Sequence, residues 1–383
     1  MSPKKTKIDV LIVGAGFAGL VMAERLTSQL GAKCVVVEKR DHLGGNAYDA
    51  PDQLGVLTHQ YGPHYFRSNS QRIVDYLSQF TEWHPVDYKI KSYAKGQIWN
   101  FPINLNTFEQ LIGRSATSEE FEAWLEEKRE DIENPSNSEE VIVSQVGRDL
   151  YETFFEGYTL KQWKRHPRDL DASVCGRIPI RTNRDDRYLR EKFQALPKEG
   201  YTALFEKMVE ASDDLEIRLD TEFTQALEEY DFQHLVYTGP IDEFFDFKHG
   251  ALPYRSLRFE HESFTGEDLK ELQREKISGK IGHWQEAMQV NYPDPEVAHT
   301  RIVEIKHATG QEIDATSIVR EFPADWEPGD EPYYPIPAPD AAERYKLYAE
   351  MAAEEKNVSF IGRLATYRYY NMDQVVGMAL AEF

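Results

Sequence analysis

The first residues of the chain that could do chemistry are three glycines and one acid with the spacing of a dinucleotide-binding motif. Gly14, Gly16 and Gly19 follow an apolar run that ends at Val13, and Glu38 follows a second apolar run. In such a motif the first glycine permits a tight turn, the second lets the backbone approach a pyrophosphate, and the third lets helix and strand pack closely. Free N–H groups at the start of the helix attract the pyrophosphate. Glu38 lies where a carboxylate accepts hydrogen bonds from ribose hydroxyls.

Two predicted strands and a helix hold this motif in place. Residues 8–13 and 34–37 are apolar, as buried parallel strands require, and residues 20–30 show helical spacing of apolar side chains. After the acid comes a Gly-Gly-Asn segment at 44–46, which resembles the extended fingerprint of FAD proteins of the glutathione-reductase and amine-oxidase type. A plain nicotinamide dehydrogenase does not need this glycine pair. We therefore expect FAD as the cofactor, bound by Gly14, Gly16, Gly19, Glu38, Gly45 and Asn46.

The composition argues against some partners. The 383 residues carry a formal net charge of −22, so the anionic surfaces of nucleic acids and membranes would repel the protein. A few arginines focused in a cleft still suffice to hold a diphosphate. Cys34 and Cys175 give no disulfide framework, and no His, Asp or Glu grouping has metal-ligand spacing, so we expect no metal. The apolar run near the N-terminus is too short for a signal peptide or a membrane span, which favours a cytoplasmic protein.

The rest of the chain alternates between helical and strand-like patterns. Residues 177–188, rich in Arg, Asn and Asp, are predicted to form a mobile loop. Strand-like runs between residues 250 and 335 predict an antiparallel sheet. The predicted helices are 71–80, several within 107–170, 201–211, 341–353 and one from 372. The predicted strands are a hairpin at 88–101, then 215–219, 254–259, 287–292, 300–305, 317–321 and 358–361.

These patterns predict an α/β protein with a discontinuous FAD-binding Rossmann-like domain, an inserted helical domain and an antiparallel β-sheet domain. The FAD-binding domain is expected at 1–84, 195–247 and 340–383. The helical substrate domain is expected at 104–175 with a mobile loop at 176–190, and the sheet domain at 85–103 and 248–339.

Two arginines and one aromatic segment are candidates for substrate binding. Arg177 and Arg301 suit phosphate, although an ion-paired or solvated role explains each one taken alone. Residues 154–163 hold four aromatic side chains, which either pack in a core or form a stacking platform for a base or sugar. Nothing forms a decisive Ser-His-Asp triad, so the chemistry is left largely to the cofactor.

Ten ordered segments along nearly the whole chain resemble the bacterial UDP-galactopyranose mutase family. They include GAGFAG at 14–19, FFEGYTLKQW at 154–163 and GRIPIRTNRDDRY at 176–188. The others lie at 38–48, 61–66, 99–108, 197–202, 291–307, 320–335 and 362–374. The resemblance implies an isomerase that interconverts the pyranose and furanose forms of a nucleotide sugar, with UDP-galactose the first choice. It also implies a homodimer and a role of galactofuranose in cell-wall polysaccharide.

The mechanism implied by the resemblance uses the reduced form of FAD without net redox change. In that family, flavin N5 attacks the anomeric carbon of the sugar and displaces the nucleoside diphosphate. The sugar is held covalently while its ring opens and recloses through a different hydroxyl. The diphosphate then returns to the anomeric carbon.

The resemblance also implies roles for individual residues. Arg177 resembles a mobile-loop arginine and Arg301 a fixed one, which together clamp the diphosphate, and His64 resembles a histidine that shapes the reactive face of the flavin. The implied substrate-binding residues are Tyr158, Trp163, Tyr188, Tyr334, Tyr369 and Asn371, and the implied flavin contacts are Arg363 and Met372.

Four positions depart from the family pattern. Arg67 stands where the family usually has His, Asn371 and Asp373 stand where it has Asp and His, and Phe322 stands where it often has Tyr. These changes leave the sugar and the base open, including a deoxysugar, an N-acetyl sugar or a thymidine nucleotide. Two other functions also stay open: a redox flavoenzyme of amine-oxidase type, and a protein that binds a nucleotide sugar without converting it.

Overall fold

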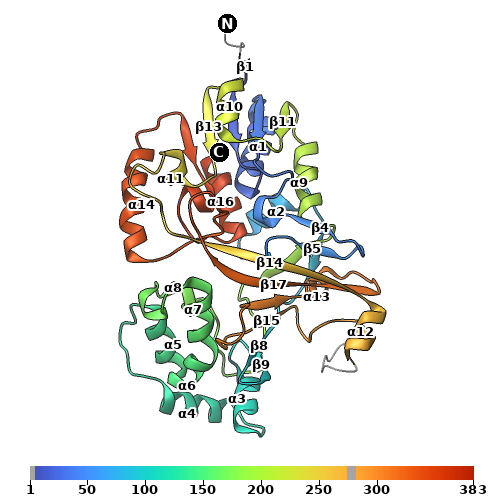
Figure 1. Ribbon diagram of the computed structural model, residues 1–383, viewed down its shortest axis with the longest axis vertical. Coiled ribbons are helices and arrows are strands. Elements are labelled where there is room, and N and C mark those ends of the chain that lie inside the picture. Colours follow the sequence, from blue (N-terminus) through green and yellow to red (C-terminus); the bar gives the residue numbers. More distant parts are fainter. Residues whose placement is uncertain (1–4, 274–281) are drawn as a thin grey trace.

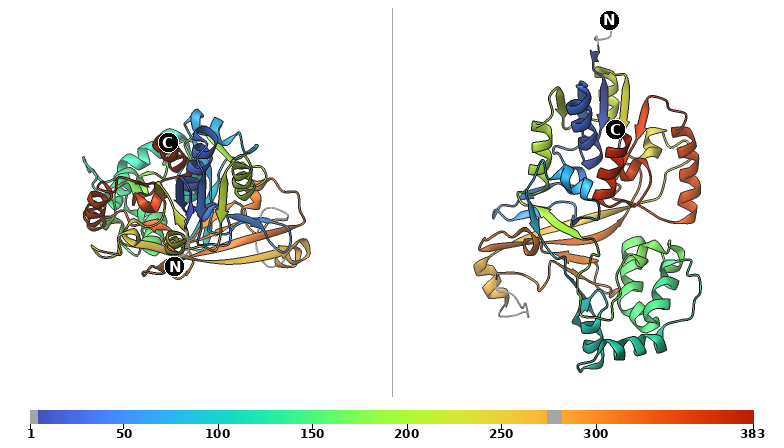
Figure 2. Two further views of the ribbon diagram at one scale, coloured as in Figure 1. Left: turned by 90° about the horizontal axis from the view of Figure 1, so that it is seen from above. Right: turned by 180° about the vertical axis from the view of Figure 1, so that it is seen from behind.

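The computed structural model describes residues 5–273 and 282–383. Figure 1 shows a parallel sheet with its helices at one end of the molecule and a group of short helices at the other. Between them, two long strands, β14 (Tyr254–Thr265) and β17 (Ala315–Asp325), run across the molecule. The first described strand, β1 (Thr6–Lys7), and the last helix, α16 (Met372–Glu382), both lie in the region of the parallel sheet (Figure 2).

The parallel sheet has five strands in the order β11-β3-β2-β13-β19. Both faces of this sheet are covered by apolar side chains, as an all-parallel sheet requires. On one face α1 (Phe17–Leu30) packs against α16 (Met372–Glu382), so the first and last helices share a layer. The expected Rossmann-like domain, assembled from distant segments, is therefore confirmed. Its strands are β2 (Val10–Val13), β3 (Cys34–Val37), β11 (Leu215–Arg218), β13 (His234–Tyr237) and β19 (Val358–Phe360).

The second large sheet has seven strands in the order β18-β14-β17-β16-β15-β8-β9. Its strands β14 and β17 pair antiparallel over their length, from Arg255 opposite Asp325 to Thr265 opposite Ala315. This pairing explains why both strands are longer than the runs 254–259 and 317–321 predicted from local pattern. The other strands are β8 (Ile90–Ala94), β9 (Gln97–Phe101), β15 (Gln289–Asn291), β16 (Arg301–Val303) and β18 (Tyr334–Pro335).

One pair of strands departs from the antiparallel arrangement expected for this sheet. Strands β8 and β15 run parallel, with Ile90 opposite Gln289. A parallel pair needs a long connection rather than a tight turn. Here the connection is the whole chain between the two strands, and local sequence pattern does not reveal such a pairing.

The helices between β9 and residue 176 pack with β8 and β9 around an apolar core distinct from that of the parallel sheet. Capping explains where several of them begin: Asn104 and Thr117 each form a capping box, and the Asn137 side chain accepts from the N–H of Glu140. These helices are α3 (Leu105–Ile112), α4 (Ser118–Lys128), α5 (Ser138–Val146), α6 (Arg148–Tyr151), a π-helix (Glu152–Glu156), α7 (Gly157–Trp163) and α8 (Ser173–Gly176).

Shorter elements complete the fold. The further helices are α2 (Gln71–Leu77), α9 (Tyr201–Glu210), α10 (Phe223–Glu229), α11 (Ile241–Phe244), α12 (Gly266–Gln273), α13 (Lys306–Thr309), α14 (Pro339–Ala352) and α15 (Gly362–Ala365). The further strands are β1 (Thr6–Lys7), β4 (Asp49–Pro51), β5 (Leu57–His59), β6 (Phe66–Ser68), β7 (Trp83–Pro85), β10 (Phe193–Pro197) and β12 (Tyr230–Asp231). Among the helices of the described residues, none is both long and apolar enough to cross a membrane.

Candidate active site

The glycine motif forms a close-packed turn at the carboxyl end of β2. Gly14 has φ of +101°, and a Cβ there would lie 2.1 Å from Thr238 Oγ1. A Cβ on Gly19 would lie 1.9 Å from the carbonyl oxygen of Gly14, so this position brings α1 directly onto the turn. Gly45, with φ of +55°, stacks against the backbone of Gly16. The two glycine segments thus form one cradle, and a side chain would clash at Gly14 and Gly19.

Glu38 is fixed beside this cradle. It is 7% exposed, and its carboxylate accepts from the N–H of Ala15 at 2.9 Å and from the N–H of Arg40 at 3.1 Å. The Arg40 side chain, which sequence reasoning missed, donates to Asn46 Oδ1 at 2.9 Å and to Glu331 at 2.6 Å. These bonds tie the acid, the glycine turn and a distant loop together at one end of a pocket. That pocket is lined by Gly14, Gly16, Glu38, Gly45, Asn46, His64, Arg363 and Met372, among others.

A second pocket adjoins the first. His64, Arg363 and Met372 line both, so the dinucleotide pocket opens into this second cleft. The cleft also collects most of the residues predicted to bind substrate, which come from widely separated segments. They are Arg177, Tyr188, Arg301, Tyr334, Tyr369 and Asn371.

Arg301 is held in the cleft by a buried carboxylate. Arg301 lies on β16 directly opposite Glu321 on β17, and its Nε and Nη2 donate to Glu321 Oε2 at 2.9 and 2.7 Å. Burial acts against the charge on Arg301, but the negative charge of Glu321 raises the pKa of the guanidinium well above its ordinary value. Glu321 is fully buried, and its Oε1 has no hydrogen-bond partner within the described residues. Sequence reasoning missed Glu321, although a charged residue on a buried strand was the available signal.

Arg177 and Arg363 approach the same place from other segments. Arg177 follows α8 and is an exposed residue, and its guanidinium lies 4.8 Å from the centre of the Tyr369 ring. Arg363 lies 5.6 and 5.5 Å from the ring centres of Tyr334 and Tyr369. Burial acts to raise the pKa of the Tyr369 hydroxyl, but Arg177 and Arg363 lower it below its usual value. Three guanidinium groups thus converge on one cleft of an acidic protein, as an anionic ligand requires.

His64 is a neutral imidazole at the junction of the two pockets. Burial is the main cause that lowers its pKa to about 3. Its Nδ1 lies 2.9 Å from the carbonyl oxygen of Gly62, which assigns the proton to Nδ1 and leaves Nε2 as an acceptor. The His64 backbone N–H donates to Nδ1 of the buried His59 at 3.1 Å.

The aromatic segment 154–163 divides between core and pocket. Phe154, Phe155 and Trp163 are buried in the helical core, whereas Tyr158 is half-buried. Tyr158 and Trp163 line a third, narrow pocket that continues from the cleft and shares Arg177 and Arg301 with it. The core interpretation is therefore confirmed for Phe154, Phe155 and Trp163, whereas a stacking role for Tyr158 stays a prediction.

The segment predicted to be a mobile loop is irregular in structure and tied down at several points. Tyr188 N–H donates to the carbonyl of Tyr88 at 2.8 Å, and Arg181 N–H to that of Ile103 at 3.1 Å. Arg177 lies before both of these hydrogen bonds in the chain, and Tyr188 itself forms one of them.

The departures from the family pattern lie in two places. Arg67 Nη2 donates to Asn371 Oδ1 at 2.8 Å, and both residues line the cleft. Burial raises the pKa of the nearby Asp373. Phe322 instead lies on β17, under the guanidinium of Arg258 and beside His299. The departures from the family pattern at Arg67 and Asn371 therefore lie in the cleft itself.

Although the sequence spacing predicted no metal site, the fold does bring together His283, Glu304 and His307.

Two family models match the chain. One described as UDP-galactopyranose mutase matches residues 153–369, and one described as NAD(P)-binding Rossmann-like domain matches residues 12–80. The chain is also 36% identical over 375 residues to a probable UDP-galactopyranose mutase of Klebsiella pneumoniae, covering 97% of this chain and 93% of that protein.

The chain belongs to the UDP-galactopyranose mutase family. It is therefore an enzyme of an isomerase family with a nucleotide-binding Rossmann-like domain. Another relative in this family, a dTDP-fucopyranose mutase of Escherichia coli, is 35% identical and covers 97% of this chain and 96% of its own length. The fold is similar to that in a crystal structure of reduced UDP-galactopyranose mutase, with a TM-score of 0.73 at 17% identity over 97% of this chain and 92% of that one.

Proposed function

We propose that this protein interconverts the pyranose and furanose forms of a nucleotide sugar, with UDP-galactose as the first candidate and reduced FAD as the cofactor. The observation that carries the proposal is the cleft lined by Arg177, Arg301 and Arg363, which opens into the dinucleotide pocket through His64, Arg363 and Met372. A diphosphate placed among these guanidinium groups would lie next to the end of the bound dinucleotide.

The residues of the first pocket fit FAD. The cradle of Gly14, Gly16 and Gly45 leaves backbone exposed where a pyrophosphate would lie, and the N-terminus of α1 points there. Glu38, already oriented by two backbone N–H groups, can accept from the ribose. When bound, reduced FAD supplies a nucleophilic N5 that can bond covalently to the anomeric carbon, with no net redox change.

The protein's own side chains then have distinct tasks in the cleft. Arg301, fixed by Glu321, and Arg177, exposed and carried by an irregular segment, stabilise the charge of the diphosphate as it leaves and returns. Neutral His64 offers Nε2 as an acceptor at the junction of the pockets. Tyr158 and Trp163, with Tyr188, Tyr334 and Tyr369, form the wall against which base and diphosphate bind.

The test is anaerobic incubation of the purified protein with dithionite and a panel of UDP- and dTDP-sugars, analysed by chromatography for furanose products. Conversion of at least one sugar with reduced flavin, and its absence with oxidised flavin, is the expected result. Undiminished turnover with oxidised flavin in air contradicts the proposal. Hydrogen peroxide release with amine substrates supports the redox alternative, and tight binding of UDP without conversion of any sugar supports a binding protein.

The identity of the sugar is a finer proposal. The two relatives are named for a UDP-galactose and a dTDP-fucose reaction, and their identities to this chain differ by one percentage point. Arg67 and Asn371 form a hydrogen-bonded pair in the cleft at two of the positions where the chain departs from the family pattern. The panel of substrates should therefore include deoxy and N-acetyl sugars linked to both UDP and dTDP. Arg67→His, which restores the residue usual in the family, should be tested on the same panel.

Four further expectations accompany this proposal. We propose the division into a nucleotide-binding part at 1–84, 195–247 and 340–383, a helical part at 104–175 with a mobile loop at 176–190, and a sheet part at 85–103 and 248–339. We also propose a homodimer, to be tested by light scattering after size-exclusion chromatography. A cytoplasmic location and a role of the product in cell-wall polysaccharide complete the proposal, to be tested by cell fractionation and by loss of furanose from the polysaccharide of a deletion strain.

A further inference from the structure

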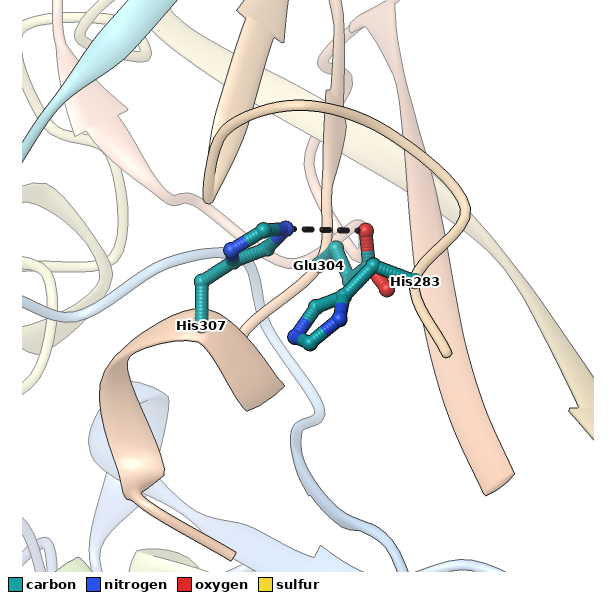
Figure 3. Close-up of side chains that lie close together, drawn as sticks. All are labelled: His283, Glu304 and His307. Atoms are coloured by element: carbon teal, nitrogen blue, oxygen red, sulfur yellow. Dashed lines mark ion pairs between the residues drawn. The ribbon is translucent and has the colours of Figure 1, made fainter. Parts of the chain in front are cut away.

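Two histidines and one glutamate meet beyond the end of β16, and none of them is among the residues found to line the cleft. Glu304 follows β16, His307 lies in α13, and His283 lies in the segment before β15. Their candidate ligand atoms all lie within 4.8 Å of one another. Figure 3 shows the three side chains converging on one small region, with the His307 ring facing the Glu304 carboxylate. We propose that these residues form a structural binding site for a divalent transition-metal ion, with Zn²⁺ as the best fit.

The donor set and its spacing suit such an ion. Two imidazoles and one carboxylate are a known protein ligand set for Zn²⁺, completed by a water. A tetrahedral ion with bonds of roughly 2.1 Å places its ligand atoms about 3.4 Å apart. His307 Nε2 and Glu304 Oε2 are 3.2 Å apart, close to that spacing before any ion is present. A small shift of His283 would complete the set.

The two histidine rings are held close to one another. The rings of His283 and His307 have centroids 4.1 Å apart and an interplanar angle of 43°. Neutral imidazole is the form that binds a metal ion, and two rings this close can each present a ring nitrogen to the same ion.

The carboxylate is oriented by surrounding hydrogen bonds. Glu304 is fully buried and accepts from the N–H of Trp284 at 2.9 Å, from the N–H of Gln285 at 3.0 Å and from Thr316 Oγ1 at 2.6 Å. Such outer contacts fix a ligating carboxylate in its binding geometry. A buried carboxylate is also costly to desolvate, so a bound cation would offset that cost.

An ion at this place would join three segments of the sheet region. It would link the segment before β15, the end of β16 and the first turn of α13. His283 is 9% exposed and the side chain of His307 is 10% exposed, so solvent can reach the rim and supply a water ligand. Because β16 carries Arg301, the ion would stabilise the strand beneath the cleft without contacting substrate.

The experiment uses the full-length, flavin-loaded protein after treatment with EDTA and dialysis. Titration with Zn²⁺ by calorimetry, and with Co²⁺ by visible absorption, is expected to show one site with a dissociation constant in the micromolar range or tighter. Saturating Zn²⁺ is expected to raise the melting temperature by about 3 °C or more. His283→Gln and His307→Gln should each weaken Zn²⁺ binding at least tenfold and remove the Co²⁺ band.

His249→Gln, outside the cluster, is the matched control and should bind Zn²⁺ as the unmodified protein does. If binding is unchanged in His283→Gln and His307→Gln, the ion lies elsewhere and the proposal is wrong. It is equally wrong if the unmodified protein shows no binding tighter than about 100 μM, because the three residues are then only a hydrogen-bonded cluster. Circular dichroism of each metal-free variant separates loss of the ligand from loss of the fold.

Discussion

At the scale of single residues, the cleft depends on arginines whose positions are set in different ways. Arg301 is clamped by Glu321 on the neighbouring strand, whereas Arg177 is exposed and rests on an aromatic ring. A clamped guanidinium is preorganised for an anion, and an exposed one can move toward it. Both are expected to contribute directly to diphosphate stabilisation.

Arg177→Ala and Arg301→Ala are each expected to lower kcat/KM by roughly 100-fold or more, because each removes a positive charge from the departing diphosphate. The measurement is steady-state conversion with reduced enzyme, together with UDP binding by calorimetry. Arg184→Ala is the matched control, since Arg184 lies in the same irregular segment but is exposed and paired with Glu109. Equal activity in Arg177→Ala and Arg184→Ala would remove Arg177 from the site.

Glu321→Gln is expected to lower kcat/KM by about tenfold or more, because the amide keeps the shape but loses the charge that holds Arg301. The control is Glu262→Gln, which alters the ion pair with Arg320 on the same sheet, where the glutamate side chain is 44% exposed. Glu262→Gln should leave turnover unchanged. A similar loss in both variants would point to a general effect on the sheet.

His59 gives a prediction about pH. Burial lowers its pKa to about 3 from an ordinary 6.5, and the ring is 3% exposed. Between these values the unfolded chain binds a proton that the folded protein does not, so stability is full above about pH 6.5 and falls as the pH drops. At pH 5 this costs about 2 kcal/mol relative to pH 7.5.

Urea denaturation at both pH values measures this loss, and His59→Asn should reduce it. Asparagine retains an acceptor for the His64 N–H but does not titrate. His249→Asn controls for the change in histidine content. An unchanged pH dependence in His59→Asn would show that other groups cause the loss.

At the scale of elements, the sequence pattern predicted those helices and strands whose positions are set by residues close to one another in the chain. The strand–turn–helix–strand unit at the start was predictable because each glycine has its own steric reason and the strands are apolar throughout. The full length of β14 and β17 was not predictable, because each strand continues only where it pairs with the other. The parallel pairing of β8 with β15 and the meeting of Arg301 with Glu321 also depend on tertiary register. Most of the cleft residues were predicted through resemblance to a family, since their segments are far apart in the chain.

Gly19→Ala tests the closest contact of the glycine turn. A Cβ there would meet the Gly14 carbonyl oxygen at 1.9 Å, so α1 must shift away from the turn. We expect loss of most bound flavin, measured by absorbance at about 450 nm per protein, and a lower melting temperature. Gly31→Ala, at the end of the same helix, meets no atom within 4 Å and should lose only about 1 kcal/mol of stability for its φ of +62° while keeping its flavin. Full flavin content in Gly19→Ala would contradict this account of the motif.

At the scale of the whole molecule, the cleft and the third pocket that continues from it gather residues from elements far apart in the chain. Tyr158 and Trp163 come from the helical part, Arg301 from the long sheet, and Arg363 from the segment that follows the parallel sheet. The third pocket shares Arg177, Arg301, Tyr334 and Tyr369 with the cleft. A ligand in this place therefore contacts several parts of the chain at once.

UDP at about 100 times its dissociation constant is expected to stabilise the folded protein by about 2.7 kcal/mol. Since the ligand bridges the parts, scanning calorimetry should show one transition that moves upward by a few degrees rather than one of two transitions moving alone. Arg301→Ala should lose most of this shift. Two separate transitions, with only one responsive to UDP, would show that the helical part does not take part in binding.

The central strand of the parallel sheet has a consequence for how the molecule is made. β2 pairs on one side with β3, which follows soon after it, but on the other side with β13, where His234 is the partner of Val10. During synthesis one edge of β2 therefore stays unpaired until the chain has been made as far as β13. Unpaired apolar strand edges promote aggregation, and pairings between strands far apart in the sequence form slowly. Low expression temperature or chaperone co-expression is therefore expected to raise the soluble yield.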